Sequence, residues 1–218
     1  MDPYYLRPEV SNSDLTDLKN QLWPREMPDP TDAYKFGNLI DAMITESDRV
    51  DYFRRTLGEL QFTPEEFEKA EKMKRAFYND EFCRTLATGA AGQCVMVKRR
   101  DFNYNGYAFE LDTRCKWDLW RQDWGWGSDI KSTAATSQSQ FEAAARYFDY
   151  DRQRAFYMGV SGSERDVLIG ISKTNFKVFK IFINRNTSFY KEGEQKVLEL
   201  AFRWFLIYGE NKNKQKAA

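Results

Sequence analysis

The dipeptide Asn105-Gly106 constrains the fold more than any other feature, because it stands between two long runs rich in β-branched and aromatic residues. Such a dipeptide between strand-like runs indicates a tight β-hairpin turn, since both residues tolerate positive φ. The flanking runs CVMVKRR and YAFELDTRCKWDLW therefore predict a pair of antiparallel strands. Further strand-like runs in GWGSDIKST, VLIGISK and VFKIFI extend this pair to a mixed sheet.

Helical patterns lie on both sides of these runs. FGNLIDAMIT, which follows Thr31, has an apolar stripe at helical spacing. TPEE places Thr63 at an N-cap and Glu66 three residues later, which is a capping box, and predicts a helix to about Leu86. Other helices are predicted over about 13–23, 137–158 and 191–209.

The length of 218 residues is typical of one domain with a substantial core. We expect an α/β (α+β) fold with a central mixed β-sheet flanked by helices. Five of the six prolines fall within the first thirty residues, which predicts an N-terminal arm with one short helix over 1–30. The main domain is expected over 31–208, and the polar, basic residues 209–218 are expected to form a disordered tail.

The absence of histidine removes several hydrolytic mechanisms at once. Ser-His-Asp triads, Cys-His pairs and zinc proteases of the His-Glu-x-x-His type all require that residue. Three scattered cysteines without a Cys-x-x-Cys pair indicate core residues. Hydrolysis by this chain would therefore rest on carboxylates, lysine, tyrosine and a hard metal ion.

Charge and hydropathy restrict the partners. With 33 acidic and 33 basic residues, a nucleic-acid partner would require a local basic surface. No apolar run is long enough for a membrane span, and MDPYYLRPEV lacks the layout of a signal peptide. We therefore expect no membrane partner and a cytoplasmic location.

The tripeptide Asp129-Ile130-Lys131 is the clearest candidate for chemistry. In a strand, Asp129 and Lys131 point to one face while Ile130 points to the other. If the preceding hairpin turn centres on residues 123–124, Asp118 lies directly opposite Asp129. Two like charges in that position are destabilising, and a divalent cation between them would reverse the sign.

Such a cation would find three oxygen ligands in Asp118, Asp129 and the backbone carbonyl of Ile130. Water and phosphate would complete the coordination that magnesium prefers. Lys131 could then hold or deprotonate an attacking water, or neutralise charge in the transition state. On spacing alone, however, a solvated hairpin edge explains these residues better.

Three segments in order, CKWD, SDIKST and YFDYDRQRAFYM, resemble the PD-(D/E)xK nuclease superfamily. The resemblance is to the branch of exonuclease VIII and its phage recombination relatives, with lambda exonuclease a more distant cousin. FGNLIDAMIT resembles the early helix of that family, and the likeness runs from about residue 36 to residue 208. It implies a restriction-endonuclease-like core.

The resemblance also implies roles for individual residues. Asp118 and Asp129 would be metal ligands and Lys131 the catalytic lysine, while Gln153 and Tyr157 would orient the site or contact the scissile strand. Arg152 and Arg154 flank Gln153, so at least one could face DNA, although we expect packing or solvent for either.

Two positions depart from the family pattern. Trp117 occupies the position of the proline in the family name. Asp41 stands where the early helix usually carries His or Glu, and its shorter reach puts a second metal site in doubt. An exposed helix residue is an equally good interpretation of Asp41.

The resemblance implies a Mg²⁺-dependent deoxyribonuclease, with Mn²⁺ able to substitute. It would digest one strand of linear double-stranded DNA from an end, 5′ to 3′, for recombination or repair. A homo-oligomeric ring and a single-strand-annealing protein are the implied partners, in a bacterial or phage-infected cytosol. The alternatives are an endonuclease of the same fold, a catalytically inactive DNA-binding or scaffold protein, and a helix-rich interaction protein without nucleic acid.

Overall fold

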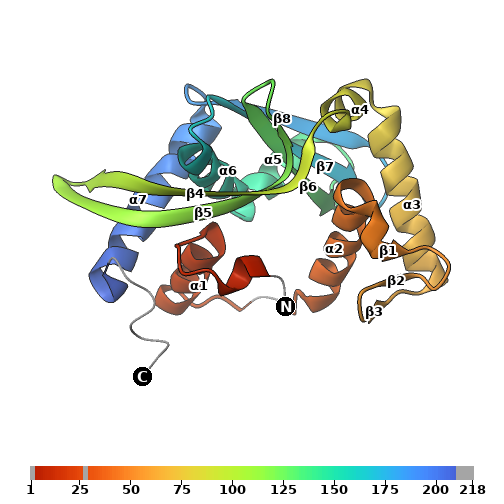
Figure 1. Ribbon diagram of the computed structural model, residues 1–218, viewed down its shortest axis with the longest axis horizontal. Coiled ribbons are helices and arrows are strands. Elements are labelled where there is room, and N and C mark those ends of the chain that lie inside the picture. Colours follow the sequence, from red (N-terminus) through yellow and green to blue (C-terminus); the bar gives the residue numbers. More distant parts are fainter. Residues whose placement is uncertain (1–2, 27–28, 210–218) are drawn as a thin grey trace.

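A long β-hairpin organises the structure, a computed structural model that describes residues 3–26 and 29–209. The turn at Asn105 and Gly106 has φ of 52° and 87°, as predicted for this dipeptide. The hairpin belongs to a five-stranded sheet in which the strands follow chain order and only β6 and β7 are parallel. Its strands are β4 (Ala91–Tyr104), β5 (Tyr107–Arg121), β6 (Trp126–Thr133), β7 (Arg165–Ser172) and β8 (Val178–Asn184). Figure 1 shows the hairpin reaching well beyond the rest of the sheet.

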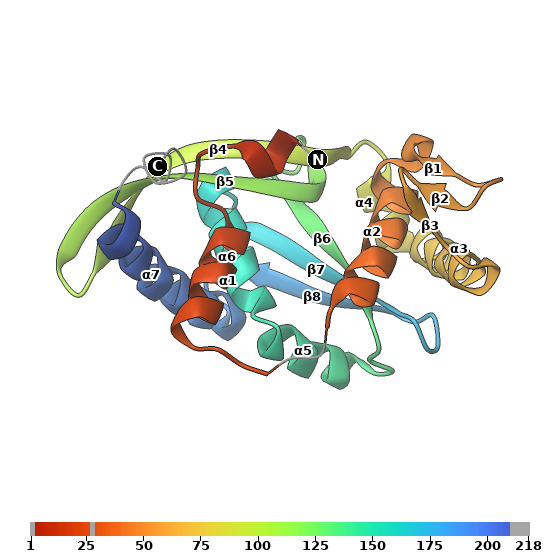
Figure 2. The same ribbon diagram turned by 90° about the horizontal axis from the view of Figure 1, so that it is seen from below.

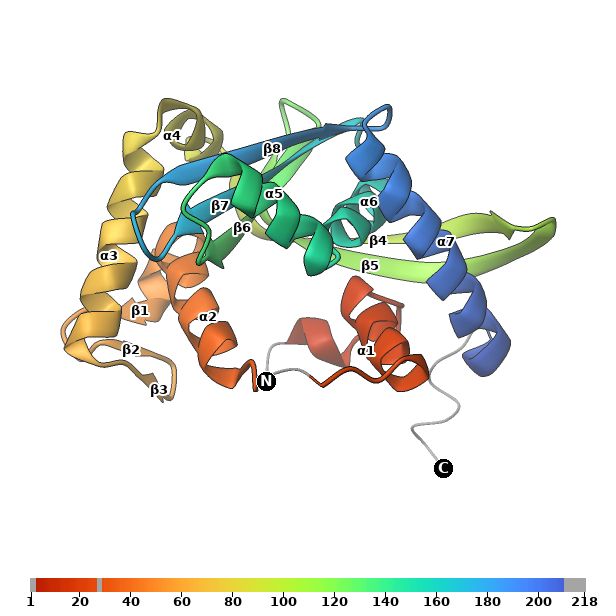
Figure 3. The ribbon, with the colours of Figure 1, turned by 180° about the vertical axis from the view of Figure 1, so that it is seen from behind.

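Helices cover both faces of this sheet, as Figures 2 and 3 show. Their bounds are α1 (Asn12–Leu22), α2 (Thr31–Thr45), α3 (Pro64–Asn79), α4 (Glu81–Ala87), α5 (Gln138–Tyr147), α6 (Tyr150–Ser161) and α7 (Ser188–Tyr208). Two short 3₁₀ helices, η1 (Pro3–Leu6) and η2 (Ser47–Arg49), complete the helical elements of the described residues. The predicted mixed sheet flanked by helices in one α+β domain is confirmed.

Two apolar clusters lie on opposite faces of the sheet. Leu168 of β7 belongs to the cluster with α1, α5, α6 and α7. Its neighbours Val167 and Ile169 point the other way, into the cluster with α2, α3 and α4. A strand that is covered on both faces has apolar side chains at successive positions. This is why VLIGIS shows no alternation of polar and apolar residues.

Two predicted long helices are wrong because each is broken at an aspartate. The helix that begins after Thr63 ends at Asn79, since the Asp80 side chain accepts from the Cys83 N–H and caps a new helix. The second break is at Asp149, which has φ of 55° between α5 and α6.

The sequence did not predict a small three-stranded sheet of β1 (Val50–Asp51), β2 (Thr56–Leu57) and β3 (Leu60–Gln61). Strands of two residues are too short for an alternating pattern to show. The predicted disordered tail lies outside the described residues, apart from Gly209. Within residues 3–26 and 29–209, no helix combines the length and apolar character that a membrane crossing needs.

The two helices α6 and α7 approach each other closely at Gly193. A Cβ at this position would lie 2.1 Å from the carbonyl oxygen of Asp151, far inside van der Waals contact. The neighbouring Gln195 is exposed on the same helix. The absence of a side chain at Gly193 therefore sets the distance between α7 and the start of α6.

We predict that Gly193→Ala destabilises the protein by about 1–3 kcal/mol, because the helices must separate to admit the methyl group. Helix propensity alone would favour Ala by about 1 kcal/mol, so a loss of stability isolates the packing effect. Urea unfolding measures the change, with Gln195→Ala as the matched control on the exposed face. A Gly193→Ala protein as stable as the control would contradict the close approach.

Candidate active site

The site begins where β5 and β6 part. Their backbone pairing has the predicted register and ends at Leu119 and Ser128. The next predicted pair, Asp118 opposite Asp129, is not formed: the Ile130 N–H donates to Asp118 Oδ2 at 2.6 Å instead. Since the N–H and C=O of a strand residue point to the same side, the carbonyl of Ile130 also faces the gap.

Asp129 and Lys131 share one face of β6, as predicted. Lys131 Nζ forms an ion pair with Asp129 Oδ2, while the Ile130 side chain is buried in the apolar cluster on the other side. Burial lowers the pKa of Lys131, but the charges of Asp129 and Asp118 outweigh it and raise the pKa to about 12. Lys131 is therefore protonated at neutral pH.

Arg154 of α6 holds Asp129 from the other side. Its Nη1 lies 3.1 Å from Asp129 Oδ1, and its Nε lies 3.1 Å from Asp166 Oδ2 on β7. The guanidinium is fully buried, and its carbon lies 4.8 Å and 4.3 Å from the ring centres of Trp117 and Tyr157. The structure thus places Tyr157 and Trp117 around a buried cation.

Asp41 of α2 also belongs to this group of charges, so the interpretation as an exposed helix residue is wrong. Gln93 Nε2 donates to Asp41 Oδ2 at 3.0 Å, while Asp41 Oδ1 is buried without a hydrogen-bond partner. Burial and the charge of Asp129 raise the pKa of Asp41 to about 6. Burial, followed by the charges of Asp41 and Asp129, raises the pKa of Asp118 well above its ordinary value.

These mutually repelling carboxylates fit a divalent cation. In the described part of the chain, no three His, Cys, Asp or Glu side chains form a group that could hold a metal ion. Mg²⁺ needs fewer, since one or two carboxylates with water and a substrate phosphate suffice. Asp118 and Asp129 with the Ile130 carbonyl could supply the protein oxygens, whereas Asp41 does not complete a three-carboxylate group with them.

The helix motif contributes through Tyr150 as well as through the predicted residues. Lys131 Nζ lies 5.1 Å from the centre of the Tyr150 ring, which packs over the ammonium. Gln153 Oε1 is buried without a hydrogen-bond partner. Arg152 and Arg154 are both buried, so neither of these two side chains is solvated.

Four residues of the site escaped prediction: Gln93, Tyr150 in contact with Lys131, Arg154 as a partner of Asp129, and Asp166. Gln93 has φ of 50° near the start of β4, and no sequence signal marks a glutamine for that conformation. The partnership of Arg154 with Asp166 depends on packing between a helix and a strand.

Comparison with known proteins identifies relatives by family and by fold. Residues 11–204 match the family described as "PDDEXK-like domain of unknown function (DUF3799)". None of the curated proteins matches the chain significantly. A candidate exonuclease from Eubacterium rectale has a TM-score of 0.55 at 16% identity, over 90% of this chain and 73% of its own.

Two further solved structures are more distant. A phage-related exonuclease from Haemophilus somnus has a TM-score of 0.43 at 11% identity, covering 93% of this chain and 97% of its own. An alkaline exonuclease from Laribacter hongkongensis has a TM-score of 0.33 at 14% identity, covering 96% of this chain and 93% of its own. The likeness to the Eubacterium rectale protein shows a shared fold.

Asp41→Asn should stabilise the metal-free protein at pH 8 by about 1–3 kcal/mol. The folded-state pKa near 6 exceeds the ordinary value of 3.8, so ionised Asp41 costs free energy above pH 6. Asparagine keeps an oxygen for Gln93 but carries no charge. Thermal unfolding in EDTA, with the exposed Asp48→Asn as control, measures the change; a destabilised Asp41→Asn protein would contradict it.

Replacing Arg154 by Met should destabilise the protein by about 3–5 kcal/mol, because buried Asp166 would lose the cation that pairs with it and Asp129 would lose one of its two cations. Adding Asp129→Asn and Asp166→Asn to Arg154→Met removes those charges and should recover more than half of the loss. Urea unfolding of the single and triple variants gives both values. Equal stability of Arg154→Met and the exposed control Arg165→Met would rule out the ion network.

Proposed function

The chain belongs to the PDDEXK-like family DUF3799, and from that premise we propose that it is a divalent-metal-dependent deoxyribonuclease acting on linear double-stranded DNA from an end. The family match spans residues 11–204. It gives the nuclease type of the fold, while substrate and mode of cleavage are our inference from the site.

The convergence of Asp118, Asp129 and Lys131 at the gap between β5 and β6 carries this proposal. A solvated hairpin edge would leave these side chains exposed, but Asp129 is only 2% exposed and forms ion pairs on both sides. Burying a carboxylate among other carboxylates costs stability. Such an arrangement is expected where charge is needed for chemistry.

Each residue of the candidate active site has a separate role in the proposed reaction. A divalent ion held by Asp118 and Asp129 would supply Lewis acidity toward the scissile phosphate. Lys131 is protonated in its ion-paired state, so it stabilises developing negative charge and hydrogen-bonds an attacking water. Arg154 fixes the orientation of Asp129, and Tyr150 limits the movement of the Lys131 ammonium.

Finer features of the proposal rest on the resemblance to phage recombination exonucleases. We propose Mg²⁺ as the metal, 5′ to 3′ polarity, and a role in recombination or repair beside a single-strand-annealing protein. We also propose a homo-oligomeric ring. A ring needs basic residues only along its channel, which is compatible with equal numbers of acidic and basic residues in the chain.

A catalytically inactive DNA-binding protein is the second candidate, and one observation favours it. Both oxygens of Asp129 already face cations, Lys131 on one side and Arg154 on the other. A metal must compete with these ion pairs for the same carboxylate.

Digestion of linear duplex DNA labelled separately at its 5′ and 3′ ends tests the proposal. With Mg²⁺ or Mn²⁺ we expect loss of label from linear DNA, no cutting of closed circles, and no reaction in EDTA. Lys131→Ala should lower the rate by about 10²-fold or more, because it removes a charge aimed at the transition state. Lys69→Ala on the exposed face of α3 is the matched control and should retain full rate.

Two of the alternatives have their own result in this assay. Cutting of closed circles would identify an endonuclease of the same fold. A protein that binds DNA and melts normally, but cuts with neither metal, would contradict catalysis and support the inactive DNA-binding candidate.

A further inference from the structure

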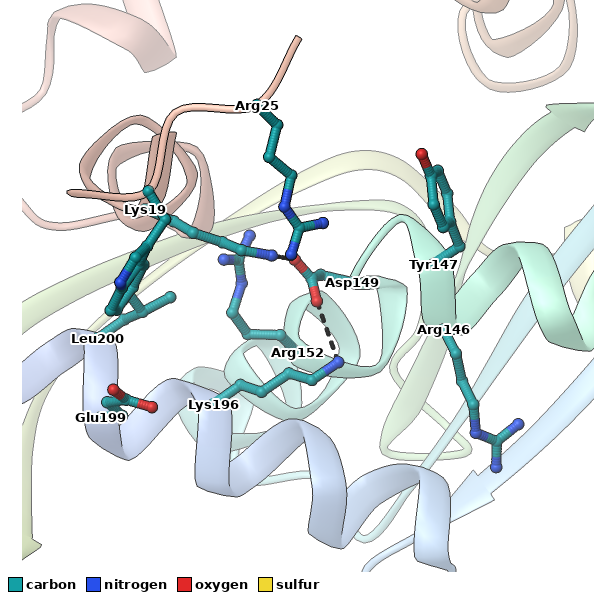
Figure 4. A pocket seen from close by; sticks show the side chains of 10 residues that line it. Lys19, Arg25, Arg146, Tyr147, Asp149, Arg152, Lys196, Glu199 and Leu200 are labelled. Carbon is teal, nitrogen blue, oxygen red and sulfur yellow. Dashed lines mark hydrogen bonds and ion pairs between the residues drawn. The ribbon is translucent and has the colours of Figure 1, made fainter. Parts of the chain in front are cut away.

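A basic pocket lies beside the bend between α5 and α6, away from the carboxylates. Its volume is about 380 Å³, within the range of small-ligand sites. Five basic and two acidic side chains line it, and Figure 4 shows Lys19, Arg25 and Lys196 extending toward Asp149, whereas Arg146 points away. The lining charged residues are Lys19, Arg25, Arg146, Arg152, Lys196, Asp149 and Glu199.

Most of these charges are already paired. Lys19 and Lys196 both bind Asp149, and Lys196 also lies 2.8 Å from Asp151. Arg146 pairs with Glu192 at 3.3 Å.

The remaining acid, Glu199, pairs with Arg203 at 2.9 Å. Arg25 and Arg152 form no ion pair with any carboxylate of the described residues. The pocket therefore has two arginines without an ion-pair partner, although the charges of Asp149 and Asp151 lie close enough to act on Arg152.

Arg152 gives more direct evidence for a ligand than the charge of the pocket does. Its side chain is 2% exposed, and it donates to two neutral groups of α1: Nε to Asn12 Oδ1 at 3.1 Å and Nη2 to Thr16 Oγ1 at 2.6 Å. Its Nη1 is buried without a hydrogen-bond partner. A buried guanidinium nitrogen without an acceptor costs stability, and an anion in the pocket would satisfy it.

The backbone bends beside the pocket, at Asp149. Asp149 has φ of 55°, a strained conformation for a residue other than glycine, and its carboxylate binds Lys19 and Lys196 instead of capping α6. The next residue, Tyr150, packs over Lys131 of the candidate active site. Two consecutive residues therefore join the pocket to the site.

We propose that this pocket binds a phosphate group of the DNA chain, at a position separate from the carboxylates. The assignment to DNA rests on the proposed function. Arginine presents a planar fork of N–H donors that matches phosphate. Arg25 reaches into the pocket from the segment after α1 and lines it together with Arg152, so the two could contact one phosphate (Figure 4).

Binding of a fluorescent duplex in EDTA, measured by anisotropy between 50 and 200 mM salt, tests the proposal. Arg25→Gln and Arg152→Gln should each lower the slope of log affinity against log salt by about 0.9, and weaken binding about tenfold near 0.1 M salt. Arg54→Gln, an exposed arginine in the loop between β1 and β2, is the control and should keep both values. Arg25 is on the surface, so its variant carries the test if Arg152→Gln unfolds.

A second experiment distinguishes a phosphate of the DNA chain from free phosphate as the ligand. Thermal unfolding in inorganic phosphate, against chloride of equal ionic strength, should show stabilisation that both variants lose. If this stabilisation is lost while the salt slopes for DNA are unchanged, the pocket binds free phosphate and the assignment to DNA is overturned. If both variants keep the salt slope of the parent protein and phosphate does not stabilise the parent, the proposed phosphate site is refuted.

The same proteins distinguish this proposal from the nuclease function. If cleavage depends on Lys131 but DNA binding is unchanged by substitution of Arg25 or Arg152, the proposed phosphate site in the pocket is refuted and the nuclease function is not. If DNA binding depends on these arginines but the protein does not cut DNA, the phosphate site is supported and the proposed catalytic function is refuted.

Discussion

The buried ion network around Arg154 is the interaction on which the site depends. It joins α6 to β6 through Asp129 and to β7 through Asp166, so one side chain fixes the helix motif against two parallel strands. Burial raises the pKa of Asp166 to about 7 even beside the guanidinium. A buried network of this kind adds little net stability, but any unpaired member is costly, which holds Asp129 in one position.

The second constraint is the gap between β5 and β6. Regular pairing beyond Leu119 would occupy the backbone groups of Ile130, whereas the Asp118 side chain takes the N–H and leaves the carbonyl facing the gap. On the far side of β5, Gln93 interrupts β4 with positive φ and donates to Asp41. Two local departures from sheet geometry thus direct backbone and side-chain oxygens to one place.

The sequence predicted the parts of the fold that depend on neighbouring residues. The Asn105-Gly106 turn, the hairpin register and the shared face of Asp129 and Lys131 follow from local rules. The break at Asp149 does not, because the lysines that bind its carboxylate come from two distant helices. The burial of Arg154 could not be predicted from the sequence either. The ion-pair partner of an arginine in a helix is decided by how the helix packs on the sheet.

The two charged regions of the surface have opposite electrostatic requirements. Without a metal, the carboxylates offer a phosphate no free positive charge, because Lys131 and Arg154 already pair with Asp129. A divalent ion would add positive charge at the carboxylates and nowhere else. The pocket beside the bend keeps Arg25 and Arg152, which have no ion-pair partner, in either state. Under the proposed function, the first attraction of DNA therefore does not require the metal, whereas the placement of a phosphate at the carboxylates does.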